Sequence, residues 1–187
     1  MGLFDFFKKK DTKEEYTRPD FADLFVTDLE TGYVLNYDLK TWVVVEHIEY
    51  DWGDEQFSQE FKIDNGEEVA TLFVEESDDV AISIVRDDNS AEVLPAWIEH
   101  FKQVGTPQQE LTYNGITFKY SSESAGYCRN ITTQPEVWRE FMLYTYLDST
   151  NRYCISIEQW NDNDFDISCS KQIADYEISS IYPSKRD

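Results

Sequence analysis

The chain has 187 residues, of which 41% are hydrophobic and 16% aromatic, with 7 glycines and 5 prolines. This length fits one domain, and the composition excludes collagen-like, low-complexity and wholly disordered chains. The 16 basic and 38 acidic residues give a net charge of −22, which repels phosphate backbones and excludes a nucleic-acid-binding protein. An acidic, aromatic-rich globular protein remains.

The cysteines and the apolar runs indicate the cellular compartment in which the protein is expected. Cys128, Cys154 and Cys169 are widely spaced, without a C-x-x-C pair. Charged residues interrupt every apolar run near the start, so no signal peptide is expected, and no run is long enough to span a bilayer. We therefore expect a cytoplasmic protein with reduced thiols.

Residues 1–20 differ from the rest, because their five basic and five acidic residues cancel. The whole net charge of −22 therefore falls on residues 21–187. Residues 1–10 contain an apolar group followed by a basic group, namely Leu3, Phe6 and Phe7, then Lys8, Lys9 and Lys10. We expect a flexible amphipathic segment. It is either a loosely docked terminus or a short anchor for a partner or the inner membrane face.

Strand-like patterns fill most of the remaining chain. The first group, within residues 21–91, covers 34–37, 42–50, 57–63, 69–74 and 80–85. The second group, within residues 108–187, covers 111–113, 116–120, 140–146, 152–158, 165–170 and 176–182. A long polar stretch around Gly126, Tyr127 and Cys128 shows no strand pattern.

One amphipathic helix is predicted between the two groups of strands. Its apolar residues recur at helical spacing over Glu92–Val104, with Ser90 as a candidate cap and Pro95 in the first turn. Gly105 and Pro107 end it. Residues 92–107 thus form a connecting helix and linker.

The two groups of strands match each other in order. Four matches support this, which are Leu35-x-Tyr37 and Trp42 with Leu111-x-Tyr113 and Phe118, Glu60-Phe61 with Glu140-Phe141, Leu72-x-Val74-Glu75 with Ile155-x-Ile157-Glu158, and Ala81-Ile82-Ser83 with Asp166-Ile167-Ser168. The alternative is a chance alignment of β-rich segments. We predict a mainly β protein, in which two similar antiparallel units form a compact barrel- or sandwich-like domain with one connecting helix.

The sequence resembles a bacterial domain-of-unknown-function family, DUF4178, over most of residues 28–183. The first-half segments are Thr31-Gly32-Tyr33, Asn36-Tyr37, Trp42-Val43-Val44, Glu49-Tyr50-Asp51-Trp52-Gly53 and Leu72-Phe73-Val74-Glu75-Glu76. The second-half segments are Leu111-x-Tyr113-Asn114-Gly115-x-x-Phe118 and Ile181-Tyr182-Pro183. The family usually has glycine in the first hairpin, where this chain has Asp38-Leu39-Lys40. The resemblance supplies no catalytic residues and implies an accessory protein of membrane-associated systems.

Few residues offer familiar catalytic or metal chemistry. The sequence has two histidines, His47 and His100, and lacks an H-E-x-x-H motif, a phosphate-binding glycine loop and a G-x-S-x-G elbow. Asp162, Asp164 and Asp166 have the opening spacing of a calcium loop but not its later glycine and glutamate. They are weak metal candidates at most, and we expect no cofactor.

Acidic turns that carry tryptophan are the best candidate binding residues. Residues 46–79 contain 13 acidic residues and one lysine, Lys62, and such a field attracts cations. The candidate partner-binding residues are Trp52, Trp160, Asp51, Asp54, Glu75, Glu76, Asp78 and Asp79. We expect a non-enzymatic binding protein that presents this surface to a basic partner. The alternatives are a small-cation or polyamine binder using the acidic turns, and an enzyme using Glu75 and Glu158 as paired carboxylates.

Overall fold

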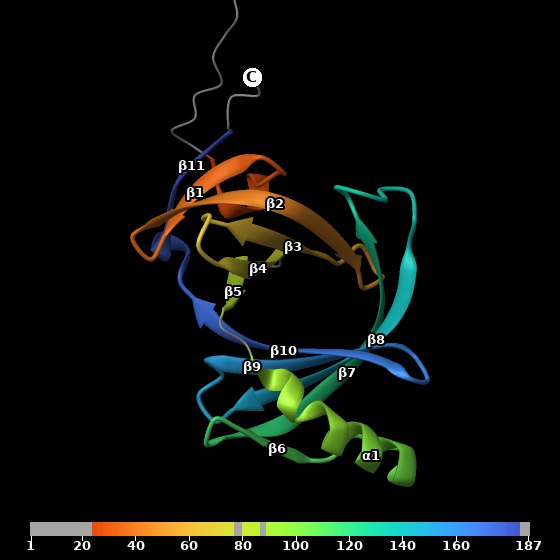
Figure 1. Ribbon diagram of the computed structural model, residues 1–187. Helices are drawn as coiled ribbons and strands as arrows, with labels where there is room; N and C mark the ends of the chain where they lie inside the picture. The colour runs from red at the N-terminus through yellow and green to blue at the C-terminus, as the bar shows by residue number, and fades with distance from the viewer. Residues whose placement is uncertain (1–23, 77–79, 87–88, 184–187) are drawn as a thin grey trace, which may run out of the picture.

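The computed structural model describes residues 24–76, 80–86 and 89–183 (Figure 1). Its strands are β1 (Tyr33–Tyr37), β2 (Lys40–Asp51), β3 (Phe57–Asp64), β4 (Val69–Glu76), β5 (Val80–Val85), β6 (Glu110–Tyr113), β7 (Ile116–Asn130), β8 (Arg139–Asp148), β9 (Tyr153–Asn161), β10 (Asp164–Ile173) and β11 (Ile178–Pro183). Its helices are η2 (Val26–Asp28), η3 (Ser90–Glu92), α1 (Leu94–Val104) and η4 (Asp175–Glu177). The predicted anchor residues Leu3, Phe6, Phe7, Lys8, Lys9 and Lys10, and the acidic residues Asp78 and Asp79, lie outside the described residues.

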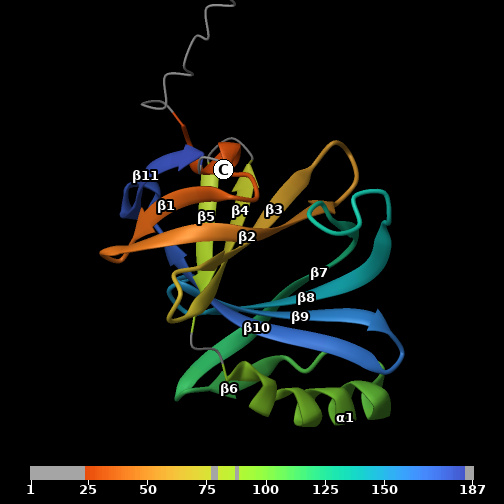
Figure 2. The same cartoon turned by 45° about the horizontal axis from the view of Figure 1, so that its top comes forward.

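Eleven strands form one sheet in the order β11-β1-β2-β3-β4-β5-β10-β9-β8-β7-β6. An additional antiparallel pairing joins Ile48–Asp51 of β2 to Tyr127–Asn130 of β7. This pairing closes β2, β3, β4, β5, β10, β9, β8 and β7 into a ring, while β1, β11 and β6 extend beyond it (Figure 2). The predicted mainly β class and the single helix of more than one turn are confirmed in the described residues.

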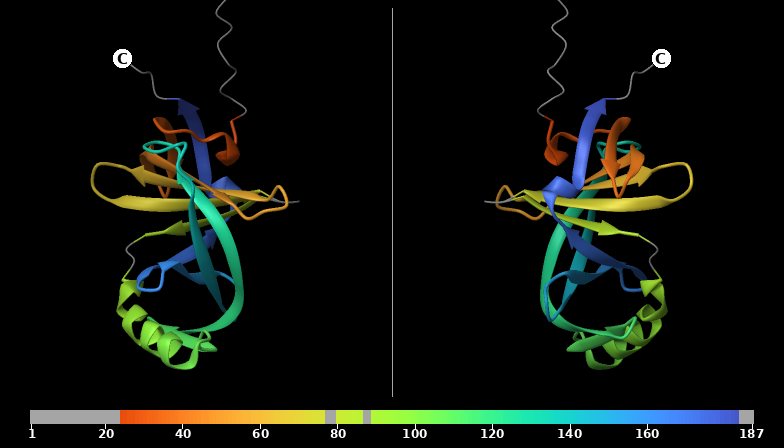
Figure 3. Two further views of the ribbon diagram at one scale, coloured as in Figure 1. Left: turned by 90° about the vertical axis from the view of Figure 1, so that its right-hand side faces the viewer. Right: turned by 90° about the vertical axis from the view of Figure 1, so that its left-hand side faces the viewer.

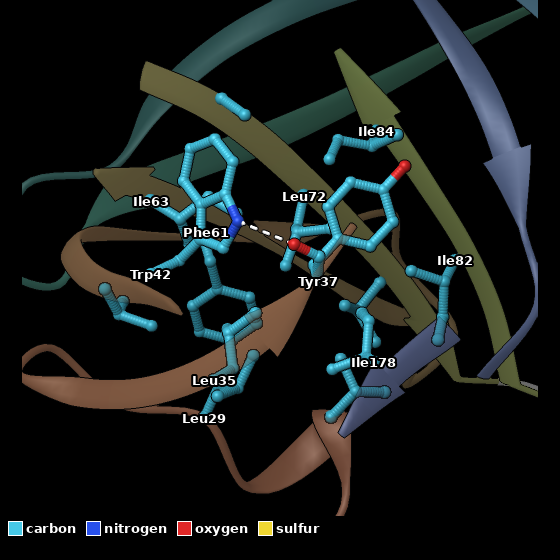
Figure 4. Packing of buried hydrophobic residues seen from close by; sticks show 14 of the residues in the cluster. Leu29, Leu35, Tyr37, Trp42, Phe61, Ile63, Leu72, Ile82, Ile84 and Ile178 are labelled. Atoms are coloured by element: carbon cyan, nitrogen blue, oxygen red, sulfur yellow. Dashed lines mark hydrogen bonds between the residues drawn. The ribbon is translucent and has the colours of Figure 1, made fainter. Parts of the chain in front are cut away.

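The first apolar core covers the outside of the ring on the side of β2–β5. It buries side chains from these strands under β1, β11 and η2 (Figure 4). Within it the Trp42 indole N–H donates to the Tyr37 carbonyl at 3.1 Å, which satisfies the polar atom of a fully buried ring. Full burial of a large apolar side chain contributes roughly 1.5–3 kcal/mol, so this core is a main source of stability.

A second core lies at the other end of the molecule, under α1 and β6 (Figure 3). Trp97 of α1 is fully buried there, and its indole N–H donates to the Tyr146 hydroxyl at 2.6 Å. The helix begins at Leu94, later than predicted, because residues 90–92 form a 3-10 turn. Ser90 is therefore not its cap, which is Val93. Gly105 ends the helix at φ 79°, in the left-handed region that favours glycine.

Two β-bulges turn the long strands β2 and β7 from a core into the ring. The bulge in β2 lies between Val44 and Glu46, and the one in β7 between Tyr120 and Ser122. Before its bulge, β2 contributes Trp42 to the first core. Beyond the bulge, Tyr50 lies inside the ring. A bulge inserts one residue and bends the strand. The first part of each strand can therefore pair within a hairpin, while the part beyond the bulge takes part in closing the ring.

The closing part of β7 is where sequence and structure differ most. The polar stretch around Gly126–Cys128, which shows no strand pattern, is part of β7 and runs on to Asn130. Alternation is weak there because exposed side chains and a glycine occupy the strand. Ring closure consequently does not follow from the hydrophobic pattern.

The predicted duplication stays a prediction. Strands β1–β5 and β6–β10 follow one another in the same order within the sheet, as two similar units would. One of the four sequence matches is wrong in register, however. Phe61 is buried in the first core, whereas Phe141 is buried inside the ring, so Glu60-Phe61 and Glu140-Phe141 face opposite sides.

The first hairpin keeps a tight two-residue turn without the usual glycine. Asp38 and Leu39 have φ values of 50° and 60°, and the corresponding Asn114 and Gly115 have 49° and 74°. A turn with positive φ at both central residues suits a two-residue hairpin. Leu39 is fully exposed and gains no packing there, so no contact of its side chain offsets the strain of its left-handed backbone.

We predict that Leu39→Gly raises the free energy of unfolding by about 0.5–1 kcal/mol, because glycine adopts this φ without the Cβ clash. Urea denaturation measures the change. Leu39→Ala, which keeps Cβ, serves as the matched control and is expected to stay near wild type. Gly115→Ala is expected to destabilise by about 1 kcal/mol. An L39G protein no more stable than L39A would contradict this account of the turn.

Candidate functional site

A cavity of about 470 Å³ lies inside the ring and is lined by residues of all eight ring strands. Strand register explains why these side chains converge. Glu60 on β3 pairs with Phe73 on β4, and Glu158 on β9 pairs with Asp166 on β10. Directly paired residues point to the same face of a sheet, and the closed ring turns that face inward.

Two glutamates, one on β3 and one on β9, are the central polar groups of the cavity. Glu60 and Glu158 are both half-buried, with the remaining surface facing the cavity. The Tyr50 hydroxyl donates to Glu60 Oε2 at 2.5 Å. Burial raises the pKa of Glu60, and the hydrogen bond from Tyr50 opposes this effect. Among the described residues neither glutamate forms an ion pair.

Glu158 holds its proton unusually tightly. Burial raises its pKa to about 8, and the negative charges of Glu60 and Asp166 add to the effect. Tyr50 and Arg139 act in the opposite direction. At neutral pH this carboxyl is therefore mostly protonated. Burial also raises the Tyr50 pKa well above its ordinary value, so the phenol remains a hydrogen-bond donor.

An aromatic cluster closes one side of the ring interior. Phe141 lies at its centre, with ring centroids 5.4 Å from Trp52, 5.1 Å from Trp160 and 5.5 Å from Tyr50. Tyr50 and Trp52 are stacked at 5.7 Å. The cluster gives the cavity an apolar wall beside its carboxyl groups.

Trp52 and Trp160 are brought together by the ring, but not as the exposed turn residues that were expected. Both are half-buried against the aromatic cluster, and Trp160 lies within β9. The Trp52 indole N–H donates to Ser58 Oγ at 2.8 Å, and that of Trp160 to Asp166 Oδ2 at 2.9 Å. Each indole thus has an apolar body in the cluster and a satisfied polar edge.

The acidic turn residues lie apart from this site. Glu75 and Glu76, at the end of β4, are exposed, and so is Asp54. Asp51 accepts a hydrogen bond from the Gly53 N–H at 2.9 Å, which stabilises the turn after β2. Glu75 is not among the residues that line the cavity with Glu158, and the carboxylates whose charge acts on Glu158 are Glu60 and Asp166.

Glu60 was missed because its importance depends on closure. It precedes Phe61, which faces the first core, so alternation places Glu60 on the opposite face. In an open sheet that face would meet solvent, where a glutamate is unremarkable. The only sequence signal was its position in the middle of a strand.

The candidate metal ligands do not converge. Asp162, Asp164 and Asp166 are exposed around the β9–β10 turn, and Asp166 is engaged by Trp160. The described residues contain no group of three or more His, Cys, Asp or Glu side chains placed to hold a metal ion. His47 packs on Phe61 of the first core at 4.6 Å, away from the cavity.

Two arginines and the β7–β8 loop border the cavity. Arg129 lies over the Trp138 ring at 4.6 Å and forms an ion pair with Glu49 at 2.7 Å. Arg139 lies over the Trp160 ring at 4.4 Å. Loop residues 133, 134 and 137 also line the cavity. The border is thus basic, whereas the interior is acidic.

Gly126 makes room for the aromatic wall. A Cβ at this position would lie 2.9 Å from Trp52 Cε3 and 3.2 Å from Phe141 Cε1. We predict that Gly126→Ala destabilises the protein by about 1–3 kcal/mol, because the clash falls on packed rings. Thermal unfolding measures the loss. Ser124→Ala, two residues earlier on the same strand, is the control, and equal effects of the two changes would refute the proposed packing.

Glu158 makes stability depend on pH. Below its ordinary pKa of 4.5 the carboxyl is protonated in both the folded and the unfolded chain. Between 4.5 and about 8 only the folded chain keeps the proton, so its contribution to stability is lost as pH rises through this range.

In the wild type, the raised pKa of Glu158 costs stability on the order of 4 kcal/mol as the pH rises from 5 to 8.5, and we predict that Glu158→Gln removes this loss. Urea denaturation at the two pH values measures it. Glu140→Gln, on an exposed residue of β8, should leave the pH dependence unchanged. An E158Q protein with the wild-type pH dependence would show that Glu158 titrates normally.

Comparison with known proteins identifies the family. The model of a family described as "Domain of unknown function (DUF4178)" matches residues 30–175, so the chain belongs to this family. The chain is also 26% identical over 186 residues to an uncharacterised protein of Aquifex aeolicus (strain VF5), covering 98% of this chain and 99% of that protein. No solved structure matches the chain. Within the described residues, no helix has the length and apolar character needed to cross a membrane.

Proposed function

We propose that this DUF4178 protein binds a small organic cation, such as a primary amine, inside its ring. The observation that carries the proposal is the pair Glu60 and Glu158, which line one cavity and lack an ion-pair partner among the described residues. Buried carboxyl groups are stabilised in their charged form by a cation that they contact. An ammonium group would supply that charge.

The walls of the cavity suit the carbon skeleton of such a ligand. Tyr50 and Trp160 present aromatic surface beside the carboxyl groups, and Phe73 also lines the cavity. Aromatic faces attract cations and also pack against methylene groups. This proposal keeps the cation chemistry expected from the sequence but moves it from the acidic turns to the ring interior.

Binding is favoured over catalysis by the state of the nearby thiol. Burial raises the pKa of Cys128 to about 11, so the thiol stays protonated and is a poor nucleophile. Acid–base chemistry by Glu60 and Glu158 is the reaction class that the same groups would support. The proposal assigns them a binding role because a cation offsets their charge directly.

We predict that spermidine and 1,5-diaminopentane raise the melting temperature and bind measurably by calorimetry. Glu158→Gln and Glu60→Gln should each weaken binding by about tenfold or more, since each removes a charge-assisted contact. The double variant E75Q/E76Q, which neutralises exposed carboxylates of β4, is the control and should bind as wild type does. Amines that cause no thermal shift would contradict the proposal.

The same binding should strengthen with pH. An ammonium group binds the ionised form of Glu158, so association at neutral pH releases the proton that this carboxyl holds. Affinity is therefore expected to rise between pH 6 and pH 8.5, while the amine itself remains protonated. Calorimetry in two buffers of different ionisation enthalpy measures the proton release, and an affinity independent of pH would argue against contact with Glu158.

A basic macromolecular partner on the outer surface is the second candidate. The net charge of −22 favours it, because self-repulsion is relieved by a cationic surface. The control variant separates the two proposals. If E75Q/E76Q abolishes amine binding while E158Q retains it, the acidic outer surface is the binding site.

A further inference from the structure

We infer that the ligand of the ring also carries an anionic group, which Arg139 binds at the border of the cavity while the glutamate pair holds the cationic end. The ligand class is thus a zwitterion of the ω-amino acid type. This inference rests on the proposed function and adds the second recognition group.

Arg139 is the available cationic group of the cavity. It is the first residue of β8, is exposed, and lines the cavity. It forms no ion pair within the described part of the chain. Arg129 differs, since its guanidinium contacts Glu49 Oε1 through Nε at 2.9 Å and Nη2 at 2.7 Å. Of these two border arginines, Arg139 is therefore the one whose guanidinium N–H groups are not engaged in an ion pair.

Stacking holds the Arg139 guanidinium in place. Its Cζ lies 4.4 Å from the centroid of the Trp160 ring, whose N–H is fixed by Asp166. A guanidinium stacked on an aromatic ring keeps its N–H edge directed outward, where it can bind a carboxylate through two parallel hydrogen bonds. Trp160 therefore positions the arginine as well as forming part of the wall.

The backbone spacing of Glu158 and Trp160, the residue over which Arg139 lies, guides the choice of ligand length. Trp160 lies two residues beyond Glu158 on β9, which corresponds to about 7 Å along an extended strand. Two residues of extended backbone contain six bonds, so a ligand with about six bonds between its own charged groups spans this backbone distance. 6-Aminohexanoate has that length. Glycine is far too short to reach both groups.

The charge of the protein explains why both ends are needed. A simple carboxylate approaching a chain with a net charge of −22 is repelled, and Arg139 is a single compensating charge. A zwitterion is neutral overall and places each of its charges beside the opposite charge. We therefore expect 6-aminohexanoate to bind better than either hexanoate or 1,5-diaminopentane, which has the same number of bonds between its charged groups.

Calorimetry on the full chain with these four compounds tests the inference. Wild type should bind 6-aminohexanoate about tenfold more tightly than 1,5-diaminopentane, and glycine and hexanoate should bind weakly. Arg139→Gln should abolish that preference while leaving diamine binding at least as tight. Arg139→Lys should keep part of the preference, because the positive charge remains. Arg152→Gln, at an exposed arginine just before β9, is the control and should retain it fully.

The outcomes separate the two proposals. If the diamine binds and depends on Glu158, but 6-aminohexanoate shows no advantage that R139Q removes, the inference is overturned and the proposed function stands. If none of the amines or amino acids binds to a folded wild-type chain, both are wrong. Circular dichroism of each variant confirms that it is folded, and a preference lost equally in R152Q would show a general charge effect rather than a role for Arg139.

Discussion

The antiparallel pairing of Ile48–Asp51 with Tyr127–Asn130 is the interaction on which the rest of the structure depends. It converts an open sheet into a ring and gives the inner faces of eight strands a common interior. The bulges in β2 and β7 make it possible, because they bend each strand away from its hairpin partner. Without this pairing, Glu60 and Glu158 would lie on the solvent-facing surface of one open sheet.

Closure also reverses the usual polarity of a small ring of strands, whose interior is generally filled by apolar side chains. Here the large apolar cores lie outside the ring, under β1, β11 and η2 at one end and under α1 and β6 at the other. Because these outer cores supply most of the apolar burial, the interior is free to carry carboxyl and hydroxyl groups. The aromatic cluster around Phe141 is the small apolar part that remains inside.

The elements built on local pattern were predictable from the sequence. The strands flanking the Asn114-Gly115 turn and the helix around Trp97 follow from turn chemistry and periodicity. The ring was not predictable, because the closing part of β7 around Gly126 lacks alternation. The candidate site could not be predicted from the sequence either. Glu158 was singled out, but with Glu75 as its partner, and Glu60 and Arg139 acquire a role only when distant strands meet.

The most direct test of this account is a carbon-13 NMR titration of the glutamate side chains in the full chain. The enclosed pair predicts one carboxyl carbon that titrates near pH 8, assigned to Glu158 by its loss in E158Q, with a second transition perturbed by the coupling to Glu60. If every glutamate carboxyl instead titrates close to its ordinary pKa of about 4.5, the ring does not enclose the pair, and the proposed binding site fails with it.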